Sequence, residues 1–220
     1  MAVTATQVKE LREKTGAGIL DCRKALIEND GEIEASIDWL RAKGVAKAAK
    51  RAGRAATEGT VLSYIHGGGS LGVLLEVNCE TDFVARGDNF QTFVKDIAMH
   101  IAASSPRWVA EDDVPADVIT REKAIFIQQA IESGKPEHIA TKMVGGKLKK
   151  FYKENCLLLQ PFVKDEDKTI ADLVTEFVAT SGENVKVRRF IRWKLGEGLE
   201  KKVDDFAAEV AAMTGQPAQA

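Results

Sequence analysis

The spacing of the apolar residues changes near residue 58, and this change limits the possible fold more than any other feature of the sequence. Up to about residue 42, apolar residues recur every three or four positions, which is typical of amphipathic helices. After residue 58 they alternate with polar residues, which is typical of strands with one buried face. Later segments return to helical spacing. We therefore predict an α+β fold in which helices cover a small antiparallel sheet.

The N-terminal part of the chain, residues 1–42, is predicted to form a domain of three short helices. Thr4 and Gln7 fit a capping box before the first apolar set, and breaks at residues 15–18 and 29–31 separate it from the second and third sets. A unit of about 40 residues has little core of its own. It therefore needs a neighbouring domain or a partner to be stable.

A basic, alanine-rich segment follows, and we assign residues 43–57 to a helical linker. Clustered Lys and Arg side chains can contact the phosphates of a nucleic acid. A solvated helix is the simpler interpretation, because no aromatic side chain lies among them for base stacking and the whole chain has a net charge of −2.

Residues 58–200 are predicted to form the α+β core domain, and residues 201–220 a C-terminal amphipathic helix and tail. GTVLSYIH and LGVLLEVNC flank a glycine-rich turn, as the strands of a hairpin do. We expect further helices near residues 89–103, 116–133, 137–153 and 170–181, and a turn at residues 165–167. A third strand is expected near residues 185–195, with an apolar face formed by Val185, Val187, Ile191, Trp193 and Leu195.

No combination of side chains in the sequence points to catalysis or to a bound metal. The three histidines lie in unrelated segments, without the spacing of a zinc-binding helix or a nucleophile motif. The glycine run HGGGSL lacks the ending of a phosphate-binding loop and does not open a helix. The three cysteines include no CxxC pair, which argues against disulfides and structural zinc. We expect no enzymatic activity, no cofactor and no metal.

Composition and segment lengths also predict where the protein works. No apolar stretch approaches the roughly 20 residues of a membrane span, and the start of the chain lacks the apolar core of a secretory signal. We therefore expect a soluble, cytoplasmic protein without membrane contact. An organelle matrix or stroma is the alternative if a transit segment has been removed.

The segment ETDFVARGDNF, residues 80–90, has two interpretations from its residues alone. Phe83 has helical spacing with Phe90, so it could continue the buried face of one long helix. Alternatively, Asp88 and Gln91 form a new capping pattern, which would leave a short separate turn capped by Thr81. Such a turn would present an exposed aromatic side chain beside a charge, as protein-binding hot spots do.

Four segments together resemble the elongation factor Ts family. They are LREKTGAGILDCRKAL at residues 11–26, EVNCETDFVAR at 76–86, KLKKFYKENCLLLQPFVKD at 147–165 and VKVRRFIRWKLGEGLEKKVDDFAAEVA at 185–211. These segments follow the family's order and span almost the whole chain. The resemblance implies an N-terminal three-helix domain like the ubiquitin-associated domain, an α+β core, and a cytoplasmic role in the elongation step of protein biosynthesis.

The resemblance also implies an activity and a partner, namely guanine nucleotide exchange on the GTPase elongation factor Tu. It implies no direct nucleotide binding by this chain, and it leaves homodimerisation open. The residues expected to dislocate the partner's Mg²⁺ are Thr81, Asp82, Phe83 and Val84. A second partner-binding region is expected at the first interhelical turn, with Leu11, Arg12, Gly16, Ala17, Gly18 and Ile19.

Two other functions compete with this one. A small RNA-binding or translation-associated module would use the basic residues from Arg41 to Arg54 and the basic face of the third strand, and it would be indifferent to Phe83. A ubiquitin-associated adaptor would use only the three-helix domain, and it would leave the core and the segment at residues 80–90 without a role.

Overall fold

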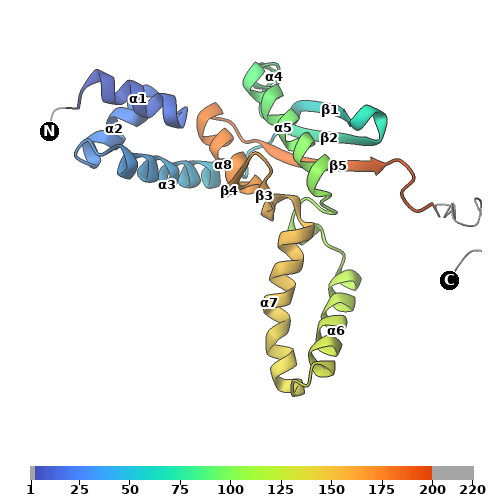
Figure 1. Ribbon diagram of the computed structural model, residues 1–220. Coiled ribbons are helices and arrows are strands. Elements are labelled where there is room, and N and C mark those ends of the chain that lie inside the picture. The colour runs from blue at the N-terminus through green and yellow to red at the C-terminus, as the bar shows by residue number, and fades with distance from the viewer. Residues whose placement is uncertain (1–2, 200–220) are drawn as a thin grey trace, which may run out of the picture.

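The computed structural model describes residues 3–199 and confirms the α+β class, with a three-helix N-terminal part and a helix-covered antiparallel sheet (Figure 1). The expected C-terminal helix at residues 201–220 lies outside the described residues. Within the described part of the chain, no helix is long and apolar enough to cross a membrane.

The N-terminal part consists of α1 (Ala5–Thr15), α2 (Ile19–Glu28) and α3 (Ile33–Arg51). The capping box at the start of α1 is confirmed, because Thr4 and Gln7 exchange backbone-to-side-chain hydrogen bonds. α3 continues well past residue 42, so the third helix and the helical part of the linker are one uninterrupted helix. The small core of this part is formed by Leu11, Cys22, Ala25 and Leu26.

A three-stranded antiparallel sheet lies at the centre of the second part of the chain. Its strands are β1 (Glu58–His66), β2 (Leu71–Cys79) and β5 (Lys186–Lys194), in the order β1-β2-β5. The expected hairpin is confirmed, and its turn is a 3₁₀ turn, Gly67–Gly69. All three glycines have positive φ, a conformation that favours glycine over residues with a side chain.

One face of the sheet is covered by α5 (Asp88–Ser104) and α8 (Ile170–Ser181). Both helices match the expected positions, and the capping box of α8 at Thr169 and Asp172 is confirmed. At the contact between the two helices Phe93 stacks on Phe177, and the ring of Phe90 meets Phe177 edge-on. The main core also contains Val73, Leu75, Val77, Val94, Ile97, Ile101, Ile170 and Val178.

The prediction of which side chains of the third strand face the core is wrong from the middle of the strand onward. Glu76 pairs with Arg189 and Val77 with Val187, so Arg188 is an extra residue in β5. One inserted residue reverses the alternation of side chains along a strand. As a result Phe190 packs on the core, whereas Trp193 on the opposite face is 68% exposed.

The remaining elements project from or support this body. α6 (Ala116–Glu132) and α7 (Glu137–Asn155) form a helical hairpin that extends away from the sheet (Figure 1). Short 3₁₀ turns, Glu111–Asp113 and Leu157–Leu159, lie at its base. The acidic residues 165–167, expected as a turn, instead belong to β4 (Asp165–Thr169), which pairs with β3 (Pro161–Phe162).

α3 packs directly against α8, and this contact joins the N-terminal helices to the core. At Gly44 the backbone approaches so closely that an added Cβ would lie 3.3 Å from the Cβ of Ala179. Arg51 at the end of α3 donates a hydrogen bond to the Val178 carbonyl, at 3.4 Å. The positions of the two parts relative to each other are therefore set along the length of α3.

Candidate partner-binding site

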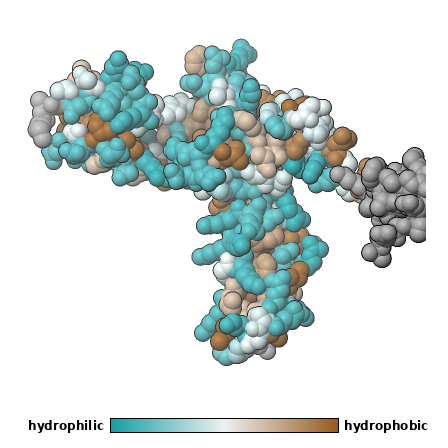
Figure 2. Space-filling view, viewed as in Figure 1, coloured by the Kyte–Doolittle hydropathy of each residue, from teal (hydrophilic) through white to brown (hydrophobic). Residues whose placement is uncertain are grey.

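A single helical turn, α4 (Asp82–Ala85), stands at the end of β2 and before α5. The Thr81 hydroxyl accepts a hydrogen bond from the Val84 N–H at 3.3 Å, so the expected cap is confirmed. Phe83 is 84% exposed, which excludes the interpretation that it belongs to the core. The region around α4 projects from the upper edge of the body, where hydrophobic and hydrophilic surface lie together (Figure 2).

The junction between α4 and α5 differs from the expected capping pattern. α5 has Gly87 as its N-cap, and Asp88 is already inside the helix. The Gln91 side chain donates a 2.6 Å hydrogen bond to the Ala85 carbonyl instead of capping α5. Ala85 itself is buried, so the end of the turn is fixed to the core while Phe83 points away from it.

The carboxylate of Asp82, the residue before Phe83, takes part in only one ion pair among the described residues, and that pair is weak and exposed. It forms an ion pair with Arg86 at 3.0 Å, and both side chains are largely exposed. Exposed pairs of this kind contribute at most about 1 kcal/mol. A cationic or hydrogen-bonding group on a partner could therefore replace Arg86 with little loss of free energy.

The base of the turn is held by Glu183, which the sequence analysis did not identify. Its carboxylate accepts hydrogen bonds from the Glu80 N–H at 3.1 Å, the Thr81 N–H at 3.0 Å and the Thr81 hydroxyl at 2.6 Å. Glu183 lies in the loop between α8 and β5. No local pattern in the sequence connects this loop to the end of β2, so no signal there could have revealed the contact.

The first interhelical turn, between α1 and α2, carries a second exposed surface. Gly16 ends α1 with φ +65°, a conformation that favours glycine, and Gly18 is the N-cap of α2. Ile19 and the adjacent Leu20 are exposed, Leu20 by 81%. Leu20 was not among the expected contact residues, although its place opposite the buried side of α2 is a signal that helical spacing provides.

The expected contact residues at this turn do not all lie at the surface. Arg12, Gly16, Gly18 and Ile19 are exposed, and Ala17 is partly buried. Leu11 is completely buried in the core of the N-terminal helices, so its side chain cannot touch a partner in this conformation. It supports the turn from inside, because an apolar side chain on the inner face of α1 packs against α2 and α3.

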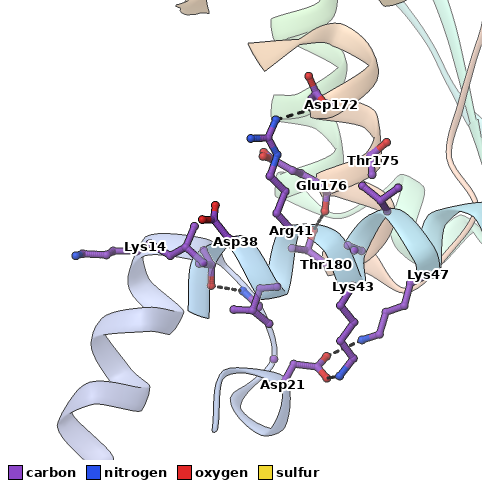
Figure 3. A pocket seen from close by; sticks show the side chains of 18 of the residues that line it. Lys14, Asp21, Asp38, Arg41, Lys43, Lys47, Asp172, Thr175, Glu176 and Thr180 are labelled. Atoms are coloured by element: carbon purple, nitrogen blue, oxygen red, sulfur yellow. Dashed lines mark hydrogen bonds and ion pairs between the residues drawn. The ribbon is translucent and has the colours of Figure 1, made fainter. Parts of the chain in front are cut away.

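A groove of about 270 Å³ lies between the first interhelical turn, α3 and α8 (Figure 3). Most of its charged side chains pair with one another. Asp21 accepts hydrogen bonds from Lys43 at 2.7 Å and Lys47 at 2.6 Å, which lowers the pKa of its carboxyl group. Arg41 approaches Asp172 on α8 at 3.8 Å. These pairs connect α2, α3 and α8 and leave little net charge in the groove to attract an ion.

The surroundings of the cysteines and of His100 indicate structural roles. Among the described residues, no cluster of three or more His, Cys, Asp or Glu side chains could hold a metal ion. All three cysteines are buried, and burial raises the pKa of the Cys156 thiol to about 11. His100 is buried against Gln160, with 3.0 Å between Nε2 and Oε1.

Comparisons with known proteins agree on one family. The model of the family described as "Elongation factor TS" matches residues 44–197. The "Elongation factor Ts" of Geobacter sulfurreducens is 61% identical over 215 residues, which cover 98% of this chain and all of the relative. The protein of the same name from Geobacter metallireducens is 59% identical with the same coverage. That from Desulforamulus reducens is 59% identical over 96% of this chain and 97% of the relative.

Proposed function

Because this chain belongs to the elongation factor Ts family and is a translation elongation factor of protein biosynthesis, we propose that it is a guanine nucleotide exchange factor. Its partner is the GTPase elongation factor Tu in the GDP-bound state. It binds this partner, disturbs the partner's binding site for Mg²⁺ and phosphate, and promotes release of GDP so that GTP can bind. The chain itself makes and breaks no covalent bond, and it acts wherever the cell carries out translation.

The exposed Phe83 on α4 is the observation that carries this proposal. Burial of an aromatic ring is favourable by about 2–3 kcal/mol, and an exposed ring does not contribute this free energy to folding. The ring can contribute it only when a partner covers it. The side chain is 84% exposed, while the residues on both sides of the turn are fixed to the core. A rigidly mounted, exposed aromatic residue is what insertion into a gap on another protein requires.

The mechanism follows from how GTPases hold a nucleoside diphosphate. Backbone donors, a lysine and Mg²⁺ compensate the phosphate charge together, so displacing the metal leaves that charge uncompensated and weakens the nucleotide. In the proposal, Phe83 enters an apolar gap beside the partner's switch region. Asp82 leaves Arg86 and disturbs the side chains and waters that hold Mg²⁺. Thr81 and Val84 keep the turn in shape.

Exchange requires that the factor and the nucleotide weaken each other. This coupling is reciprocal, so GTP that binds to the partner expels the factor to the same degree that the factor weakens GTP. Accelerating GDP release a thousandfold takes about 4 kcal/mol of differential stabilisation. A few hot-spot residues within a broad interface can supply that amount.

The first interhelical turn is proposed as the second contact with the partner. Arg12, Gly16, Ala17, Gly18 and Ile19 would contribute to this surface, with Leu20 added by its exposure and Leu11 as an internal support. The division into an N-terminal domain, a linker and a core is also part of the proposal. The N-terminal domain would supply affinity, and the core would carry the turn that acts on the metal site.

The competing RNA-binding function finds less support. Most of the basic side chains between Arg41 and Arg54 are engaged within the protein. Lys43 and Lys47 bind Asp21, Arg41 pairs with Asp172, and Arg51 donates to a carbonyl of α8. Two carboxylates, Asp21 and Asp172, compensate part of this charge, so less counterion release would accompany contact with a phosphate backbone.

The test is stopped-flow release of a fluorescent GDP analogue from elongation factor Tu at fixed Mg²⁺ concentration. We expect strong acceleration by the native chain, and a large loss of acceleration in Phe83→Ala and Asp82→Ala with unchanged melting. Ile131→Ala, which removes an exposed apolar side chain from the projecting hairpin, is the matched control and should exchange normally. Absence of acceleration by the native chain would refute the proposed function.

A further inference from the structure

The turn that carries Phe83 cannot hold its own orientation. α4 contains only four residues, and a single helical turn is unstable in isolation because its ordering costs more than its few hydrogen bonds return. Phe83 itself is too exposed to contribute core contacts. The direction in which the ring points therefore depends on how the base of the turn is attached to the rest of the protein.

Glu183 attaches that base through both oxygens of its carboxylate. Oε2 accepts from the backbone N–H groups of Glu80 and Thr81, and Oε1 accepts from the Thr81 hydroxyl. Hydrogen bonds to an ionised acceptor are about twice as strong as neutral ones. Three such bonds converge on two consecutive residues at the start of the turn.

The bond to the Thr81 hydroxyl also acts on the cap of the turn. A hydroxyl has one hydrogen and two lone pairs, and here the hydrogen is directed at Glu183. The lone pairs are then free to accept from the Val84 N–H, which lies 3.3 Å away. Glu183 thus sets the orientation of the hydroxyl that caps α4, and the two bonds in series strengthen each other.

The next residue, Asn184, continues this attachment to the end of α3. Its N–H donates to Glu80 Oε1 at 2.6 Å, and its side-chain amide donates to the carbonyls of Ala52 and Arg54. Arg54 also approaches Glu80 at 3.5 Å. The loop after α8 therefore connects the base of the turn to the helix that carries the N-terminal helices.

We propose that Glu183 is a positioning residue for nucleotide exchange, which acts by holding the Thr81–Val84 turn in the orientation that presents Phe83 to the partner. The inference rests on the proposed function and adds to it a residue that contacts neither nucleotide nor metal. Without Glu183 the turn still forms part of the time, but Phe83 occupies its productive orientation less often. The chain would then bind its partner and fail to displace the metal.

The experiment separates binding from displacement by titrating elongation factor Tu with each variant and measuring the release rate of the GDP analogue. For Glu183→Ala we expect the maximal release rate to fall about tenfold, as the loss of charge-assisted hydrogen bonds implies. The concentration for half-maximal release should change little, because the surface at the first interhelical turn is intact. Glu183→Gln keeps one carbonyl acceptor and should restore part of the rate.

Two controls distinguish positioning from simple stabilisation. Glu166→Ala removes an exposed carboxylate from β4 and should leave both parameters unchanged. In the Phe83→Ala background, Glu183→Ala should have almost no further effect, because the residue through which it acts is gone. An unchanged maximal rate in Glu183→Ala, or full additivity with Phe83→Ala, would overturn the inference while leaving the exchange function intact.

Amide hydrogen exchange on the free chain gives a readout that does not depend on the partner. We expect residues 81–86 to exchange faster in Glu183→Ala than in the native chain, with α5 unchanged. If the whole core exchanges faster, Glu183 supports the fold in general and the inference fails. If the native chain accelerates no GDP release but this local effect is present, the proposed function is wrong and the attachment of the turn is right.

Discussion

The Thr81 hydroxyl donates a 2.6 Å hydrogen bond to Glu183 Oε1, although the two residues are 102 positions apart in the chain. Thr81 caps α4 shortly after β2 ends and Glu183 follows α8, so the contact exists only when the sheet and its covering helices are assembled. An exposed turn at the edge of the core thereby takes its geometry from the folding of the whole domain.

Phe83→Ala should leave stability almost unchanged. The ring is 84% exposed, so its removal creates no cavity, and the free energy of unfolding should change by less than about 0.5 kcal/mol. Phe90→Ala is the contrasting variant, because that ring is buried between α5 and α8 and its loss should cost about 3–5 kcal/mol. Urea unfolding of both variants checks this, and a clear loss of stability in Phe83→Ala would return its ring to the core.

Replacing Thr81 tests the hydroxyl separately from the side-chain volume. Thr81→Val keeps the shape, leaves Glu183 Oε1 without its 2.6 Å partner and removes the cap at Val84. We expect a loss of about 1 kcal/mol and reduced exchange on elongation factor Tu. Thr81→Ser retains the hydroxyl and should behave nearly as the native chain. Equal activity of the Val and Ser variants would contradict the role of the cap.

A larger side chain at Gly44 should weaken the contact between α3 and α8. An added Cβ would already lie 3.3 Å from Ala179, so Gly44→Val forces the helices apart and should cost about 1–3 kcal/mol. Gly53→Ala adds a methyl group where no atom lies within 4 Å and serves as the control. Thermal unfolding compares the two, and a native-like Gly44→Val would show that close approach at this point is unimportant.

The buried His100 predicts a pH dependence of stability. Burial lowers the pKa of its imidazole below the ordinary value of 6.5, and Nδ1 accepts from the Val163 N–H at 3.3 Å, which favours the neutral ring. The unfolded chain therefore binds a proton at higher pH than the folded chain. This difference destabilises the fold increasingly as pH falls below about 6.5, toward the lowered pKa of the folded state, and has no effect above that range.

Urea unfolding at several pH values checks this sign. His100→Gln should reduce the loss of stability between about pH 6.5 and pH 5, because the titrating group is removed. His138→Gln, at an exposed position on α7, should retain the native pH dependence. If both variants keep the full dependence, another group is responsible for it.

Local patterns in the sequence predicted the elements of this fold with few errors. α6, α7, α8 and the hairpin lie where apolar spacing placed them, because the periods of helices and strands are properties of short segments. The caps at Thr4, Thr81 and Thr169 were visible for the same reason, since each joins residues three positions apart. The motif TDFV identified the candidate contact turn, but its residues alone left open whether Phe83 was buried.

Tertiary structure decided what depends on distant partners. The extra residue Arg188 in β5 is defined only by pairing with β2, and it turned Trp193 from the expected inner face to the outer one. Leu11 became a core residue because α2 and α3 close over it. Glu183 gained its role because α8 and β5 bring its loop to the end of β2. The sequence by itself determined where the helices, the strands and the turn lie, because apolar spacing and caps are properties of short segments. Burial, strand pairing and register, and the support of Phe83 follow from contacts that only the assembled chain contains.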